Sequence, residues 1–129
     1  MKKIVIICVL IVLVMAGCRY DEKIVENSNE PGVMTQELAY DLMRTGADVV
    51  LIDVRTTAEF ERAHIPESIS FPLSRIEQDA METFSLDTTL LVICQSGNRS
   101  AEAVQLLTDL GFTNVYDIGG IMTWPGDIN

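Results

Sequence analysis

The sequence predicts an α/β fold in which helices cover both faces of a mostly parallel sheet. Two apolar runs, at 49–53 and 90–93, lack the alternation of a half-exposed strand, and a further strand is predicted at 115–118. Segments with helical periodicity separate these runs, and both patterns are typical of parallel strands buried on both faces. Functional sites in such sheets lie at the carboxyl ends of the strands, so residues 53–55 and Cys94 are candidate site positions.

The first helix is predicted to begin after Thr35, a suitable N-cap, and to end at Gly46, which tolerates a left-handed conformation. Its apolar face consists of Leu38, Leu42 and Met43. The strand at 49–53 follows, and after it we expect a short helix at 56–62 and a strand at 69–71.

The second half of the domain continues the alternation of helices and strands. A helix is predicted to begin at Ser74, and its apolar stripe consists of Ile76, Ala80, Met81 and Phe84. The strand at 90–93 is followed by a helix at 100–110 and then by the strand at 115–118. Near the end of the chain, Trp124 is expected to lie in the core.

The N-terminus has the architecture of a secretory signal peptide at residues 1–17. Lys2 and Lys3 form a positive start. Residues 4–14 form an apolar stretch that is too short for a comfortable transmembrane span of about 20 residues. An uncleaved anchor helix and simple secretion are the alternatives to a signal that is cut and followed by an anchor.

Residues 15–18, Met-Ala-Gly-Cys, resemble the bacterial lipobox, although Met stands where Leu is more usual. The resemblance implies that Cys18 receives a diacylglyceryl group and that the new N-terminus is acylated, for example with palmitate. Several chains would hold the protein firmly to a membrane. We therefore expect a lipoprotein anchored at the bacterial cell envelope, outside the cytoplasm, with a polar tether at 18–32 and one domain at 33–129. A short strand through residues 24–25 is the alternative to the tether.

The chain is acidic, with a formal net charge of −10 that becomes −12 when Lys2 and Lys3 leave with the signal. Such a surface repels the phosphate backbone of nucleic acids and anionic lipid headgroups, which argues against both as electrostatic partners. A small anionic substrate would need a local positive site, which Arg99 and neighbouring backbone N–H groups could provide.

Cys94 is the only free thiol expected in the mature chain, because Cys8 leaves with the signal and Cys18 becomes a thioether. No intramolecular disulfide is then possible. The absence of a Cys or His cluster gives little support to a metal site, and no cofactor is expected. A small buried hydrophobe that ends a core strand is the alternative to a working thiol.

Cys94 opens a polar loop between a buried strand and a helix, and we expect its thiol to be exposed at the mouth of that loop. Such a loop aims successive N–H groups inward and, beside a helix N-terminus, attracts anions. The pKa of the thiol should therefore lie below its ordinary value of about 8.5. Five polar residues surround Gly97, namely Gln95, Ser96, Asn98, Arg99 and Ser100.

With these positions established, the domain resembles a single-domain rhodanese over nearly all of residues 33–124. Residues 51–55, Leu-Ile-Asp-Val-Arg, and 59–60, Glu-Phe, are similar to the first signature of that family. The other motifs are His64-Ile65-Pro66, the loop at 94–100, and Gly119-Gly120 with Trp124. Ala63 and Glu67 stand where glycines are common, which should affect a turn rather than the chemistry. The resemblance implies a rhodanese-like sheet of about five strands.

The resemblance also implies a transferase, a thiosulfate sulfurtransferase that works through a persulfide on Cys94. The thiolate would take the outer sulfur of a donor such as thiosulfate and pass it to cyanide, a thiol or a sulfur-accepting protein. Residues 95–100 would bind the substrate through their N–H groups, and Arg99 could hold an anionic donor. Pairing with a neighbouring carboxylate is the alternative for Arg99.

Asp53, Arg55, Glu59 and His64 are expected to support the structure. In the family, the first three hold loops together through ion pairs and hydrogen bonds, and acid–base catalysis is the alternative. His64 lies beside Ile65-Pro66 and is expected to pack and to form hydrogen bonds. Its alternative role is that of a base for Cys94.

Two other functions remain as alternatives to sulfur transfer. A cysteine-dependent phosphatase or arsenate reductase would also use a thiolate in an anion-binding loop. Protein phosphatases place five residues between Cys and Arg, whereas four separate Cys94 from Arg99 here, which suits one sulfur atom better than a phosphoryl group. A non-enzymatic binding module anchored at the envelope is the second alternative.

Overall fold

Four parallel strands form the centre of the computed structural model, which describes residues 32–129. They are β1 (Val50–Asp53), β2 (Ile69–Ser70), β3 (Leu90–Cys94) and β4 (Val115–Gly120), in the order β2-β1-β3-β4. Every pair of neighbouring strands is parallel. The predicted α/β fold with a parallel sheet is therefore confirmed, with four strands in the described part of the chain where about five were expected.

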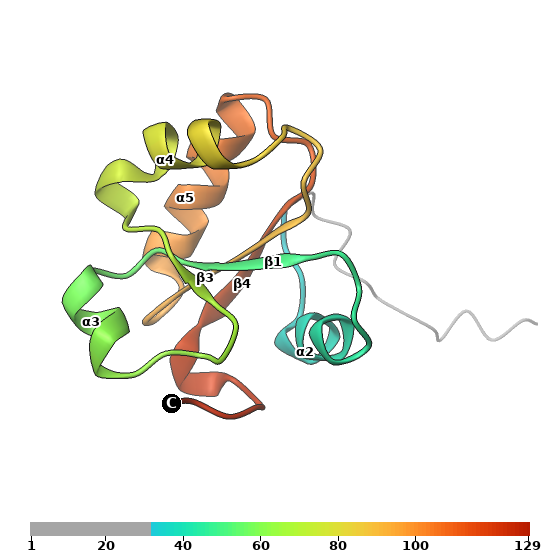
Figure 1. The fold of residues 1–129 in the computed structure, drawn as a ribbon, viewed down its shortest axis with the longest axis vertical. Helices are drawn as coiled ribbons and strands as arrows, with labels where there is room; N and C mark the ends of the chain where they lie inside the picture. The colour runs from blue at the N-terminus through green and yellow to red at the C-terminus, as the bar shows by residue number, and fades with distance from the viewer. Residues whose placement is uncertain (1–31) are drawn as a thin grey trace, which may run out of the picture.

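Helices cover both faces of this sheet (Figure 1). α4 (Ile76–Thr83) and α5 (Asn98–Asp109) pack on one face, and α2 (Gln36–Arg44) packs on the other. α3 (Thr57–Arg62) follows β1 directly. Two short 3₁₀ turns complete the elements, at Leu73–Arg75 and Ile121–Thr123.

β3 shows why the strand sequences lack alternation. Leu90, Val92 and Cys94 belong to the core cluster beneath α4 and α5. Leu91 and Ile93 point the other way, into the cluster beneath α2. All five side chains are at most 1% exposed. Full burial of an aliphatic side chain stabilises the fold by about 1.5–3 kcal/mol, so this strand is a major source of stability on both faces.

Trp124 lies in the core beneath the sheet, as expected. Its ring meets the ring of Tyr40 edge to face, with 5.6 Å between the centroids. This contact joins the C-terminal segment to α2.

Helix caps reproduce most of the predicted boundaries. The Thr35 hydroxyl accepts a hydrogen bond from the N–H of Leu38 at 3.3 Å, and Gly46 follows α2 with a φ of +76°. α5 differs, because Gly97 is its N-cap and the helix begins two residues before the predicted start at Ser100. The early start brings the first N–H groups of α5 next to the end of β3.

The predicted signal peptide, the lipidation site Cys18 and the tether lie outside the described residues. Between residues 32 and 129, none of the helices has the length and apolar character needed to cross a bilayer.

Candidate active site

Cys94 is the last residue of β3 and lies at the carboxyl edge of the sheet. Its side chain is 1% exposed, so the expectation of an exposed thiol at the mouth of the loop is wrong. The reason is that the loop folds back over the sulfur, with Gly97 directly above it. Gln95 and Gly97 are only half-buried and Ser96 is exposed, so the thiol lies just beneath the surface.

Backbone N–H groups of the loop point at the sulfur of Cys94. The N–H of Gly97 donates to Sγ over 3.0 Å. Burial raises the pKa of the Cys94 thiol, but hydrogen bonds from the Ser100 side chain and from the N–H groups of Ser100, Gly97 and Ser96 outweigh burial and lower that pKa overall. This is the direction that the loop sequence predicts.

Gly97 makes this arrangement possible through its backbone conformation. Its φ of +102° lies in the left-handed region, which a residue with a Cβ enters only at a cost of about 1–2 kcal/mol. In that conformation the chain turns sharply after β3 and aims its N–H back at Sγ of Cys94.

Ser100 lies beneath the loop and is fully buried. Its hydroxyl oxygen is 3.5 Å from Sγ of Cys94, and the hydroxyl is 3.0 Å from the carbonyl oxygen of Gly97 and 3.4 Å from that of Gly119. When the thiol ionises, this hydroxyl can turn and donate to the sulfur. Ser100 therefore links Cys94 to the loop and to β4.

The end of β4 supports the loop from below. A Cβ on Gly120 would lie 2.5 Å from the carbonyl oxygen of Gln95 and 2.8 Å from Cα of Ser96, so no side chain fits there. Gly119 has a φ of +83° and donates its N–H to the carboxylate of Asp117 at 2.8 Å. The glycine pair predicted as a closing motif thus packs directly against the loop of Cys94.

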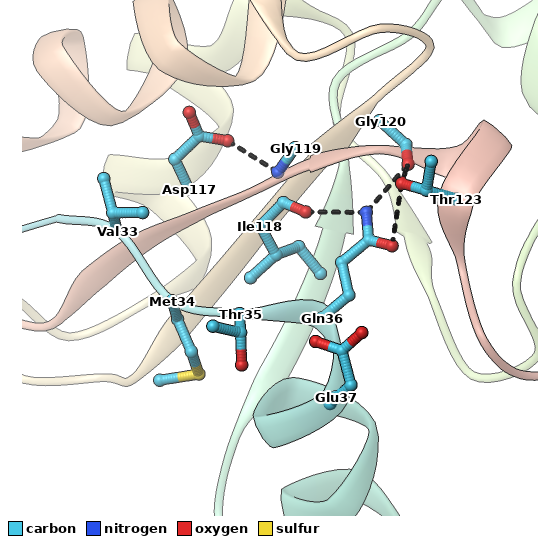
Figure 2. Close-up of a pocket in the computed structure, with 10 residues that line it drawn as sticks. All are labelled: Val33, Met34, Thr35, Gln36, Glu37, Asp117, Ile118, Gly119, Gly120 and Thr123. Atoms are coloured by element: carbon cyan, nitrogen blue, oxygen red, sulfur yellow. Dashed lines mark hydrogen bonds between the residues drawn. The ribbon is translucent and has the colours of Figure 1, made fainter. Parts of the chain in front are cut away.

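Gln36 holds the same glycine pair from the other side, a role that the sequence analysis missed. Figure 2 shows its amide nitrogen donating to the carbonyl oxygens of Ile118 and Gly120, each at 2.8 Å. The hydroxyl of Thr123 donates to the Gln36 amide oxygen at 3.1 Å. The sequence gives no sign of this role for a glutamine in the first turn of a helix, because the partners of its side chain are backbone atoms far away in the sequence.

Arg99 forms a bidentate ion pair with Glu59, with N···O distances of 2.7 and 2.9 Å. The Arg99 guanidinium and then the Thr56 N–H hold the pKa of the Glu59 carboxyl well below its usual range, and Glu59 in turn raises the pKa of Arg99. Arg99 is therefore paired with a neighbouring carboxylate, which is the alternative to its expected role of holding an anionic donor. Glu59 also completes the cap of α3 with Thr56.

Asp53 and Arg55 form a second pair, which is almost completely buried. Nη2 of Arg55 lies 2.7 Å from a carboxylate oxygen of Asp53 and donates to the carbonyl oxygen of Ala63 at 2.7 Å. The same guanidinium therefore joins the end of β1 to the turn after α3. This geometry is that of a structural support.

The contacts of His64 are with Phe60 and Asn129. Its ring stacks on Phe60 with 4.1 Å between centroids, and Nδ1 lies 2.9 Å from the Phe60 carbonyl oxygen. Its backbone exchanges two hydrogen bonds with Asn129, both 2.9 Å long. Around Cys94 the structure brings together Ser100, Arg99 and Glu59 but not His64.

Across residues 32–129 no group of three or more His, Cys, Asp or Glu side chains is placed to hold an ion. Cys94 is the free cysteine of that region.

Known proteins have sequences similar to that of this chain. The profile of the family described as Rhodanese-like domain matches residues 35–126. Thiosulfate sulfurtransferase GlpE of Pseudomonas syringae pv. syringae is 39% identical over 89 residues, which are 68% of this chain and 81% of that protein. Adenylyltransferase and sulfurtransferase MOCS3-1 of Zea mays is 36% identical over 91 residues, 65% of this chain. The chain spans only 19% of the length of that relative.

Solved structures agree with the sequence match. The crystal structure of a rhodanese-related protein from Thermoplasma volcanium superposes with a TM-score of 0.65 at 29% identity, over 76% of this chain and 97% of that one. The human single-domain sulfurtransferase TSTD1 gives a TM-score of 0.61 at 26% identity, over 68% and 88% of the two chains. Because the family profile covers most of the described domain, the chain belongs to the rhodanese-like domain family.

Proposed function

We propose that this protein is a sulfurtransferase that carries sulfane sulfur as a persulfide on Cys94. The observation that carries the proposal is the Gly97 N–H directed at Sγ over 3.0 Å, within a loop that lowers the pKa of the thiol. The thiolate is the nucleophilic form of cysteine, so a lower pKa raises its population at neutral pH. The name of the relative GlpE, a thiosulfate sulfurtransferase, supports the same reaction class.

The reaction would have two steps, with thiosulfate as the example donor. The Cys94 thiolate attacks the outer sulfur, and a new S–S bond forms. The S–S bond of thiosulfate breaks, and its electron pair leaves with sulfite. Cyanide or a thiol then attacks the outer sulfur of the persulfide, which releases the thiolate of Cys94. N–H groups of the loop stabilise the negative charge on sulfur in both states.

Hydrolysis of a phosphate ester is less compatible with this site. A phosphatase of this kind needs an arginine free to grip the phosphoryl oxygens, whereas Arg99 already donates to both carboxylate oxygens of Glu59. We expect turnover with thiosulfate and cyanide and none with an aryl phosphate. Turnover of the phosphate ester alone would reverse this choice.

The persulfide can be detected directly by intact mass. After treatment with thiosulfate, we expect a gain of about 32 Da, one sulfur atom, that maps to Cys94. Cys94→Ser should remove this adduct and the transfer activity while the fold persists. A folded wild-type protein that gains no sulfur would instead favour the non-enzymatic binding module.

We further propose that the protein is a lipoprotein held at the bacterial cell envelope through Cys18. The support is the charged, apolar and small-residue pattern of residues 1–18. When the full chain is expressed in a bacterium, it should partition into a detergent phase, and Cys18→Ser should move it to the aqueous phase. Equal partitioning of both proteins would contradict the anchor.

A further inference from the structure

Gly119 is the point at which β4 contacts the buried hydroxyl beneath Cys94. The carbonyl oxygen of Gly119 lies 3.4 Å from the hydroxyl oxygen of Ser100, which lies 3.5 Å from Sγ of Cys94. Gly119 also lies next to Gly97, because its Cα is 3.7 Å from the place that a Cβ on Gly97 would occupy. The orientation of the Gly119 carbonyl therefore bears on a hydroxyl that can donate to the thiolate.

Gly119 has little preference of its own for the orientation that the structure shows. Its φ is +83°, and glycine adopts positive and negative φ about equally well. The peptide groups on both sides of this residue can therefore rotate at low cost unless hydrogen bonds hold them.

Gln36 supplies hydrogen bonds of this kind from the first turn of α2. Its Nε2 donates to the carbonyl oxygens of Ile118 and Gly120, each at 2.8 Å (Figure 2). These two carbonyls precede and follow the carbonyl of Gly119, which is directed at Ser100 instead. By holding the two outer carbonyls, one amide group fixes the direction of the carbonyl between them.

The polar groups around the Gln36 amide hold this arrangement in one orientation. The Thr123 hydroxyl donates to Oε1 of Gln36 at 3.1 Å, which leaves Nε2 facing the two carbonyl oxygens. The Asp117 carboxylate accepts the N–H of Gly119 at 2.8 Å. That N–H belongs to the same peptide group as the carbonyl of Ile118, so this peptide group is held at both ends.

Gly120 connects Gln36 to the loop of Cys94 by a second route. A Cβ on Gly120 would lie 2.5 Å from the carbonyl oxygen of Gln95 and 2.8 Å from Cα of Ser96, so the backbone of β4 lies against the loop here. The N–H of Ser96 is one of the groups that lower the pKa of the Cys94 thiol. Gln36 therefore holds the part of β4 on which these N–H groups rest.

Water is a poor substitute for the Gln36 amide. Gln36 lines an open cavity of about 400 Å³ between the start of α2 and the end of β4 (Figure 2). That volume admits several water molecules, since each takes up about 30 Å³ in the liquid. Water can accept the role of hydrogen-bond donor to the two carbonyls, but it reorients freely and does not fix their direction. Loss of the amide should therefore disturb orientation more than stability.

We infer that Gln36 is a positioning residue for sulfur transfer and acts on Cys94 through Gly119, Gly120 and Ser100. The inference rests on the proposed sulfurtransferase function and adds to it a residue on the far side of the sheet edge from the thiol. Gln36 contacts neither the sulfur nor a substrate. It keeps the Ser100 hydroxyl and the N–H groups of the loop in the places from which they stabilise the thiolate.

The test is the pH profile of Cys94 alkylation by iodoacetamide in the full chain, measured by mass spectrometry on the peptide that contains Cys94. Gln36→Met keeps the length of the side chain and removes both hydrogen bonds. Its alkylation rate at neutral pH should fall by about threefold to tenfold, because less of the thiol is ionised. At alkaline pH, where the thiol is ionised in both proteins, the two rates should become equal. The kcat/KM for thiosulfate should follow the same pattern.

Thr35→Ala is the matched control, because it removes the N-cap of the same helix and leaves the Gln36 amide in place. Its alkylation profile should match that of the wild type. If Gln36→Met lost the same factor at every pH, or if its profile also matched the wild type, Gln36 would be a structural residue only and the inference would be overturned.

A second variant decides the question if Gln36→Met does not fold. Thr123→Val removes the hydroxyl that orients the Gln36 amide and should move the alkylation profile to higher pH by a smaller amount. An unchanged profile in Thr123→Val would then overturn the inference.

The alkylation profile also separates this inference from the proposed function. Persulfide formation by the wild type, with an unchanged profile in Gln36→Met, would overturn the role of Gln36 and leave the sulfurtransferase function standing. A shifted profile in Gln36→Met, with no persulfide on the wild type, would overturn the function and leave the effect of Gln36 on the thiol standing.

Discussion

The two arginine–carboxylate pairs near Cys94 are similar in chemistry and different in setting. Arg55 and Asp53 are two residues apart, with side chains only 5% and 1% exposed. Arg99 and Glu59 are 40 residues apart, with side chains 33% and 29% exposed. The first pair fixes the chain locally after β1, and the second joins α3 to the loop that follows Cys94.

This difference in burial determines what each pair contributes. Breaking a buried pair leaves one charge without water or a partner, which costs about 3–5 kcal/mol. A pair that is about a third exposed is screened by solvent and contributes at most about 1 kcal/mol. We therefore expect the Asp53–Arg55 pair to govern folding and the Arg99–Glu59 pair to govern the position of the loop.

The largest effect is expected for Arg55→Met. This substitution leaves the buried Asp53 carboxylate without a counter-ion, although the backbone N–H of residue 55 still donates to it, and it removes the hydrogen bond to Ala63. The free energy of unfolding should fall by about 3–5 kcal/mol in urea denaturation. Arg44→Met is the control, because its pair with Asp41 is exposed and 3.9 Å long, and it should cost less than about 0.5 kcal/mol. If both variants lost the same free energy of unfolding, the predicted difference between the buried pair and an exposed pair would be refuted.

Ser100→Ala should have the next largest effect, and on reactivity more than on folding. Loss of the buried hydroxyl should cost about 1–2 kcal/mol of stability. It should also raise the pKa of the Cys94 thiol, because the Ser100 hydroxyl is the leading hydrogen bond that lowers it. The pH profile of alkylation by iodoacetamide measures that pKa.

Ser96→Ala is the matched control for Ser100→Ala. Ser96 acts on the thiol through its backbone N–H, which alanine retains. The alkylation profile of Ser96→Ala should therefore match the wild type. If Ser100→Ala also matched it, the hydroxyl would have no role in the acidity of the thiol.

Glu59→Gln should have a smaller effect on stability, and one that depends on pH. The pKa of Glu59 is depressed in the folded state, so the pair stabilises the protein above the ordinary value of 4.5 and loses this contribution as the pH falls below it. At neutral pH the variant should be less stable by at most about 1 kcal/mol. Urea denaturation at progressively more acidic pH should show the free energies of unfolding of the variant and the wild type becoming equal.

Glu61→Gln is the control for Glu59→Gln, because Glu61 lies exposed on the same helix and has the same charge. The difference in free energy of unfolding between Glu61→Gln and the wild type should not change as the pH falls. A constant difference between Glu59→Gln and the wild type at all pH values would mean that the pair does not contribute through ionisation.

The smallest effect is expected in the turn after α3 that the Ser68 N–H closes on the carbonyl oxygen of Ile65 at 3.1 Å. Glu67 has a φ of +68° and is the non-glycine residue with positive φ in the described region. Glu67→Gly should stabilise the protein by about 0.5–1 kcal/mol, since it relieves left-handed strain and only part of this gain is lost to the entropy of the unfolded chain. Glu67→Ala keeps the strain and should give no gain in stability in thermal unfolding. Equal gains in stability for Glu67→Gly and Glu67→Ala would show that removal of the negative charge, rather than relief of strain, stabilises the protein.

Local features of the fold were predictable from the sequence, because their causes lie within a few residues. The apolar runs of β1 and β3 predict buried strands, and Thr35 predicts the start of α2. The sequence predicts a start of α5 that is two residues too late, because Gly97 caps this helix through a left-handed backbone rather than through a side chain. The expected exposure of Cys94 was wrong for the same reason, since that backbone folds the loop over the sulfur.

Contacts between distant segments could not be predicted in the same way. The polar loop marks Cys94 as the candidate nucleophile, but nothing local indicates which carboxylate meets Arg99. The requirement for glycine at position 120 arises from Gln95 and Ser96, which precede it by more than twenty residues. The role of Gln36 depends on carbonyl groups more than eighty residues away.

The most direct test of this account is the ionisation of Cys94 in the folded protein. The ultraviolet absorbance of the thiolate can be titrated against pH in the full chain, with Cys94→Ser providing the background from the other cysteines. We expect an inflection below about 8.5, the ordinary value for a thiol. An inflection at or above that value would show that burial outweighs the N–H groups of the loop, and the proposed persulfide chemistry would lose its physical basis.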